Sequence, residues 1–285
     1  MNSQYANNSN SIVRVSAIVI LISAASIAPL SSYLISICFF GLPHVLYELS
    51  YIRKNLLRIL PPAFIIIVMT LLLFLVLVRT INLISPTPYV LIIEVFTLIS
   101  LLLTSLYFRI NLTLAAMVFL FCLGLIYNPF ILLLCLSFLH NLTPWGFLSL
   151  QGKAKNAWII FLFNPVLVFM LAYFFAVDPH YISATTANTC LSHYLLSPQI
   201  NVWNSAFFAS AVYLQMIHYY FVIKVLPELS LKPIRTNRYQ WLFYIVIGFA
   251  FIAFFKTGKP IYGIIALFHA YLEIPILFYL LGYKR

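Results

Sequence analysis

Four of the six histidines in this sequence stand alone inside long apolar stretches. They are His44, His140, His218 and His269. An ionisable side chain at membrane depth is costly and usually faces a bundle interior or a cavity, where it serves a function. Imidazole is a good ligand for iron, copper and zinc, and histidine sites with open positions on non-haem iron commonly activate dioxygen. We therefore interpret these four residues as candidate metal ligands.

Two of the four histidines are followed by a carboxylate four residues later. His44 precedes Glu48, and His269 precedes Glu273, in a chain with only five acidic residues. A spacing of four places both side chains on one face of a helix. A carboxylate in that position can bind the same ion, or it can accept the second ring N–H of a ligating histidine. Glu48 and Glu273 are therefore the candidate catalytic carboxylates.

Other readings of these residues stay open. A buried histidine can simply form a hydrogen bond between membrane helices, and a His–Glu pair can be a buried ion pair. A transporter or channel would use the same residues to relay protons or bind a cation. A haem protein would need one axial histidine from each of two helices. The two remaining histidines, His180 and His193, lie in a polar stretch and are interpreted as surface residues.

The composition indicates the kind of protein that must position these residues. The chain has 285 residues, of which 64% are hydrophobic and 7% charged. Soluble domains carry about 25% charged residues, so a lipid bilayer is the solvent that fits this chain. Its apolar runs are long and unbroken, which favours helices over a β-barrel. We predict an all-α, polytopic integral membrane bundle.

The hydrophobic pattern predicts about ten transmembrane helices within a single transmembrane domain, residues 1–285, which includes a polar N-terminal tail at 1–11. A count of eight follows if two of the tight joins, such as those at Pro29 and Pro129, are only kinks. The predicted segments are 12–28, 30–52, 61–79, 89–108, 110–127, 129–150, 157–177, 202–226, 240–257 and 260–282.

The basic residues predict the orientation of these segments. With the N-terminus in the cytoplasm, all of the 16 Lys and Arg residues except Arg79, Lys256 and Lys259 fall on the inner side. An inner excess of Lys and Arg in short loops sets membrane orientation. We therefore expect a multi-pass protein of the cell membrane, taken as a bacterial inner membrane, with both termini cytoplasmic.

The net charge of +11 does not indicate nucleic acid as a partner. The basic residues form small groups between hydrophobic runs, and no soluble basic face exists. The expected partners are the lipid bilayer and a lipophilic small molecule, and the sequence identifies no protein partner.

This topology also places the four histidines at similar depth. Their helices all run from outside to inside, and the histidines lie roughly 9 to 16 residues from the outer ends, a spread of about 10 Å at 1.5 Å per residue. We therefore expect the four imidazoles to converge in one layer.

The isolated helix histidines and the stretch from His44 to Glu48 resemble the membrane-embedded β-carotene dioxygenases of the bacteriorhodopsin-associated type. In that family, such histidines are thought to hold non-haem iron that cleaves a polyene with dioxygen. The resemblance implies Fe(II) at His44, His140, His218 and His269 and a carotenoid-like substrate that arrives through the bilayer. The chain has Val45 where the family has glycine after its early histidine, and it has no His-x-x-x-His pair.

Overall fold

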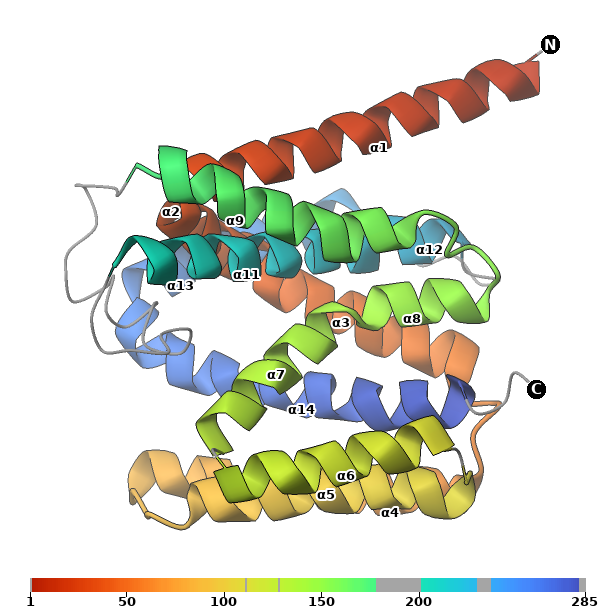
Figure 1. Cartoon of the computed structure of the whole chain (residues 1–285), viewed down its shortest axis with the longest axis vertical. Coiled ribbons are helices and arrows are strands. Elements are labelled where there is room, and N and C mark those ends of the chain that lie inside the picture. The colour runs from red at the N-terminus through yellow and green to blue at the C-terminus, as the bar shows by residue number, and fades with distance from the viewer. Residues whose placement is uncertain (1, 111, 128, 178–200, 230–236, 282–285) are drawn as a thin grey trace. The chain divides into compact units, whose positions relative to one another are not determined.

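The computed structural model describes residues 2–110, 112–127, 129–177, 201–229 and 237–281 (Figure 1). The described residues are mostly helical and contain no strand. This confirms the predicted all-α class. The polar segment around His180 and His193 lies outside the described residues.

Five of the described helices are long and apolar enough to cross a membrane, which indicates a membrane protein. They are Pro29–Leu56, Pro62–Ile84, Val90–Phe108, Val202–Leu229 and Phe255–Leu280. The structure does not fit the predicted count of about ten, because the other apolar helices have only 10–17 residues. These shorter helices are Val13–Ile27, Leu114–Gly124, Ile159–Phe175 and Arg238–Ala253.

Contacts between residues group the chain into two compact units. Unit 1 comprises Met1–Ile37 and Ala154–Tyr220, and unit 2 comprises Cys38–Lys153 and Phe221–Arg285. Each unit is described separately below. That the whole chain acts as a single transmembrane domain stays a prediction.

Unit 1 is built from α1 (Asn2–Ile27), α2 (Pro29–Ile35), the π-helical turn η3 (Ile159–Phe163), α9 (Asn164–Phe175) and α11 (Val202–Tyr220). Helices α1, α9 and α11 pack against one another (Figure 1). One pair of interior polar groups joins α9 to α11: the Asn164 amide donates to the Tyr213 hydroxyl over 2.9 Å. Residues 2–11 of the predicted polar tail form the first turns of α1.

Unit 2 carries most of the candidate site residues. Its elements are α3 (Gly41–Tyr51), η2 (Ile52–Leu56), α4 (Pro62–Ile84), α5 (Val90–Phe108), α6 (Leu112–Tyr127), α7 (Pro129–Asn141), α8 (Thr143–Leu150), η4 (Phe221–Val225), α12 (Leu226–Leu229), α13 (Arg238–Ala253) and α14 (Phe255–Leu281). Helix α14 is central: it contacts α8 on one side and α4 and α5 on the other (Figure 1), and it also contacts α3 and α7.

The predicted segment 129–150 is two helices in the structure. Helix α7 ends at Asn141, and α8 begins at Thr143 with a proline in its first turn. Proline has no amide donor, so it suits a first turn and breaks a continuing one. The break changes the direction of the chain beside His140. Thr143 therefore reaches Glu273, a position that a continuous straight helix would not give it.

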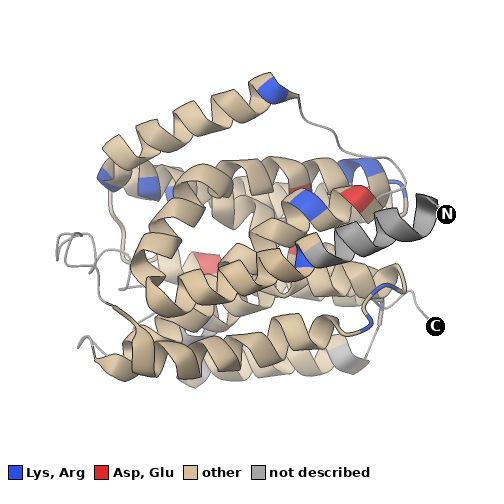
Figure 2. Cartoon of the chain, turned by 90° about the horizontal axis from the view of Figure 1, so that it is seen from above, with Lys and Arg blue, Asp and Glu red and all other residues tan. Residues whose placement is uncertain are grey.

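Charged residues are sparse along the helices (Figure 2). One buried acid in unit 2, Glu94 on α5, forms an ion pair with Arg79 on α4. The Tyr271 hydroxyl on α14 donates a hydrogen bond to the same carboxylate over 2.7 Å. A buried charge needs such partners, because its desolvation is costly. The network ties α14 to α4 and α5, on the helix that also carries His269 and Glu273.

Candidate metal centre

Three of the predicted ligands and one carboxylate come together in unit 2. His44 and Glu48 lie on α3, His140 on α7 and His269 on α14. Each offers one ligand atom, and these atoms lie within 4.8 Å of one another. His44, His269 and Glu48 are buried, with exposed fractions of 1%, 1% and 0%. Imidazole nitrogens with a carboxylate suit iron, zinc or copper, and this set could hold such an ion.

The closest contact in the cluster is between two histidine nitrogens. Nε2 of His44 lies 3.0 Å from Nε2 of His269, with the two rings at 73° to each other. Imidazole nitrogens bind a metal ion at about 2.1 Å. If the nitrogen–metal–nitrogen angle is about 90°, two such nitrogens lie about 3.0 Å apart. The spacing therefore matches two ligands of a single metal ion.

The other nitrogen of each ring faces a backbone carbonyl. Nδ1 of His44 lies 3.3 Å from the Phe40 carbonyl oxygen, and Nδ1 of His269 lies 3.4 Å from that of Ile265. A carbonyl oxygen can only accept, so these contacts favour the proton on Nδ1 and leave a lone pair on each Nε2. Two lone pairs directed at each other over 3.0 Å repel unless a cation or a proton lies between them.

The second predicted carboxylate lies beside His140. Its Nδ1 lies 2.8 Å from Oε2 of Glu273, whose side chain is fully buried. The Thr143 hydroxyl donates to the same oxygen over 2.9 Å. A carboxylate on Nδ1 fixes the orientation of a histidine and makes its Nε2 a better ligand. The ring of His140 packs edge-on to that of His269, with centroids 4.8 Å apart.

The two carboxylates differ in position, although the sequence presents them as equivalent. Oε2 of Glu48 lies 3.7 Å from Nε2 of His269, so it faces the point where the imidazoles meet. Glu273 does not belong to the mutually close set found among the described residues, and it contacts His140 instead. In both cases the carboxylate reaches a histidine of another helix, whereas the sequence predicted pairs within one helix. Glu48 is thus the candidate ligand of the two, and Glu273 is the candidate orienting residue.

The fourth predicted ligand, His218, lies in unit 1 on α11 and is fully buried. Its ring packs beside that of Tyr219, with centroids 5.9 Å apart. Its role as a metal ligand stays a prediction.

Thr143 was not predicted as a site residue, since a lone threonine carries no motif. Its place three residues after His140 and directly before Pro144 was the available signal.

Glycines allow the helices of unit 2 to approach closely beside the cluster. A Cβ atom on Gly41 of α3 would lie 2.8 Å from the Tyr262 hydroxyl of α14. A Cβ atom on Gly146 of α8 would lie 2.6 Å from a methyl group of Leu277, also on α14. Small residues at such contacts let membrane helices pack closely. Gly41 is three residues before His44, so this approach sets how near His44 comes to α14.

We expect Gly41→Val and Gly146→Val to weaken metal binding by about tenfold or more. The first pushes α3, with His44 and Glu48, away from α14, and the second pushes away α8, which begins two residues after the α7 helix that carries His140. Gly263→Val is the matched control on α14, since nothing lies within 4 Å of a Cβ atom there. The measurement is a competition titration of the purified variants with a metal chelator. Equal affinity in all three variants would mean that helix approach does not set the ligand geometry.

No protein-family model, characterised protein or solved structure matches this chain significantly. Its fold and site thus define a class only: an α-helical membrane protein with a buried histidine–carboxylate cluster that could hold a metal ion.

Proposed function

We propose that this protein is an integral-membrane metalloprotein that binds non-haem iron and oxygenates a lipophilic substrate. His44, His140 and His269 bind the ion through Nε2, and Glu48 adds a carboxylate oxygen. The approach of two Nε2 atoms to 3.0 Å is the observation that carries this proposal. It supports a positive charge between the rings, and three histidines with a carboxylate are a donor set that suits Fe(II).

Ferrous iron in such a site supplies dioxygen activation. The reaction implied by the resemblance breaks one carbon–carbon double bond of a polyene and places one atom of dioxygen on each of the two new carbonyl carbons. The residues of the chain contribute orientation and exclusion of water. Glu273 and Thr143 fix His140, and burial keeps the carboxylates of Glu48 and Glu273 out of solvent.

The bilayer supplies the substrate in this proposal. The protein is a multi-pass protein of a bacterial inner membrane with both termini in the cytoplasm, as the distribution of Lys and Arg favours. A lipophilic molecule dissolved in the membrane then reaches the centre sideways, without a soluble domain to deliver it.

The proposal predicts oxygen uptake that depends on both iron and substrate. Purified protein loaded with Fe(II) is expected to consume one dioxygen per β-carotene cleaved and to form polyene aldehydes. Glu48→Gln protein is expected to lose at least about a hundredfold in rate, because without this carboxylate the iron is no longer stably bound. Iron-loaded protein that consumes no oxygen with any polyene would contradict the oxygenase and leave a metal-binding membrane protein.

A proton between the two histidines is the alternative to a metal ion, and it favours a transporter or channel. That function predicts pH-dependent flux into proteoliposomes containing metal-free protein, and Glu48→Gln would abolish the coupling.

Haem is less compatible with the geometry. Two axial nitrogens bind on opposite faces of a porphyrin, each about 2 Å from the iron, so they lie about 4 Å apart. The Nε2 atoms of His44 and His269 are only 3.0 Å apart.

A further inference from the structure

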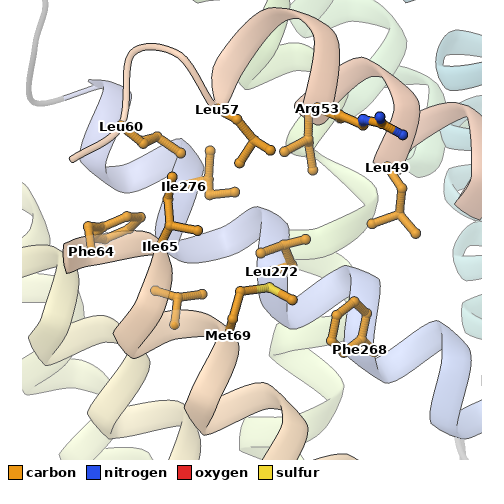
Figure 3. Close-up of a pocket in the computed structure, with 12 residues that line it drawn as sticks. Leu49, Arg53, Leu57, Leu60, Phe64, Ile65, Met69, Phe268, Leu272 and Ile276 are labelled. Atoms are coloured by element: carbon orange, nitrogen blue, oxygen red, sulfur yellow. The ribbon is translucent and has the colours of Figure 1, made fainter. Parts of the chain in front are cut away.

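A cavity of about 250 Å³ lies within unit 2, between the end of α3, helix α4 and helix α14 (Figure 3). It is lined by Leu49, Ile52, Arg53, Leu57, Leu60, Phe64, Ile65, Val68, Met69, Phe268, Leu272 and Ile276. Every lining residue except Arg53 is apolar. A hollow with such walls binds hydrocarbon and does not hold ordered water.

Arg53 gives the cavity one charged end. The side chain is exposed, and in Figure 3 its nitrogen atoms lie at the edge of the group of lining residues. Its aliphatic stem can thus line the hollow while the guanidinium remains in a polar environment. Lys54 and Arg58, both exposed, follow in the same stretch of chain and add positive charge.

No described acid neutralises Arg53. Glu94 pairs with Arg79, Glu228 with Lys224, and the carboxylates of Glu48 and Glu273 face histidines. The guanidinium is planar and presents paired N–H donors that match a carboxylate. An anion is therefore the complementary partner for this end of the cavity.

We propose that this cavity binds a single-chain anionic amphiphile, a long-chain fatty acid, with its hydrocarbon chain between α4 and α14 and its carboxylate on Arg53. The volume is below the roughly 300–1,000 Å³ of pockets for drug-sized ligands, so it fits a stretch of one chain better than a large ring system. The site needs no metal ion and does not depend on the proposed oxygenase.

The cavity lies on a flank of the helices that carry the metal centre. Leu49 directly follows Glu48 on α3, and Phe268 directly precedes His269 on α14. Consecutive residues of a helix are about 100° apart around its axis, so the cavity and the ligands occupy adjoining faces. A bound chain would therefore contact the helices that set the ligand geometry.

The test is saturable binding of radiolabelled palmitate to the full chain in nanodiscs of zwitterionic lipid, with empty nanodiscs as background. We expect one site per chain. Arg53→Gln should weaken palmitate binding at least tenfold, whereas Lys54→Gln, a neighbour that does not line the cavity, should weaken it less than twofold. The neutral long-chain alcohol of the same length should bind weakly and be insensitive to Arg53→Gln.

A second pair of variants tests the location. Met69→Trp fills the cavity from α4 and should abolish binding, while Leu73→Trp, on an exposed face of the same helix, should not. Binding that is no higher than to empty nanodiscs, or that survives both Arg53→Gln and Met69→Trp, would overturn the site. The metal content of the same samples distinguishes this inference from the proposed function. Protein that binds metal but no palmitate refutes only the fatty-acid site, and protein that binds palmitate but no metal refutes only the metalloprotein.

Discussion

Replacement of His269 with alanine is expected to reduce the bound metal of the purified protein from near one ion per chain to less than about a tenth. His269 is the residue that all other members of the cluster approach. Its Nε2 lies 3.0 Å from that of His44 and 3.7 Å from Oε2 of Glu48, and its ring packs against His140. Removing this shared ligand should lower the affinity enough for the ion to be lost during gel filtration. Elemental analysis after gel filtration measures the ratio.

Two controls make this result specific. His193→Ala removes a histidine that the sequence places on the surface, and it should leave the metal content unchanged. The elution volume of each variant in detergent shows whether the protein has kept its fold. A His269→Ala protein that elutes normally and retains its metal would remove His269 from the site.

The two carboxylates are expected to respond differently to the same substitution. Glu48→Gln should abolish stable metal binding, because Glu48 faces the ligand atoms. Glu273→Gln should lower metal affinity by only about 10- to 100-fold, the usual effect of removing a residue that orients a ligating histidine. Titration of both variants with a metal-competing chelator gives the two affinities.

Glu94→Gln is the matched control, since Glu94 is buried in the same unit but pairs with Arg79 and Tyr271. The amide can still accept the hydrogen bond from Tyr271, so metal affinity should change less than threefold. If Glu273→Gln proved the more damaging of the two cluster substitutions, the assignment of the carboxylates would be reversed.

The sequence was sufficient to predict which residues form the cluster in unit 2, because single ionisable residues in apolar helices have few alternatives. It could not predict how they pair. A spacing of four residues only indicates that His269 and Glu273 share a helix face. The contact of Glu273 with His140 depends on the rotation of α7 against α14, which is set by packing and by the break before Thr143.

The positions of the helices were also largely predictable, since long apolar runs have one stable conformation in lipid. The prediction failed where hydropathy does not indicate whether a helix continues or breaks. Residues 129–150 are predominantly apolar, yet the chain breaks before Pro144 and divides them into α7 and α8. The partner of Glu94 was missed for a similar reason, because Arg79 and Tyr271 lie on other helices and share no sequence spacing with it.

X-ray absorption at the edge of the bound metal tests the central claim most directly. The account predicts a first shell of nitrogen and oxygen at about 2.0–2.2 Å, with the outer-shell scattering of several imidazoles. That outer-shell signal should weaken in a His140→Ala protein that still retains metal. A shell that contains sulfur, a metal without imidazole scattering, or wild-type protein that binds no metal would contradict it.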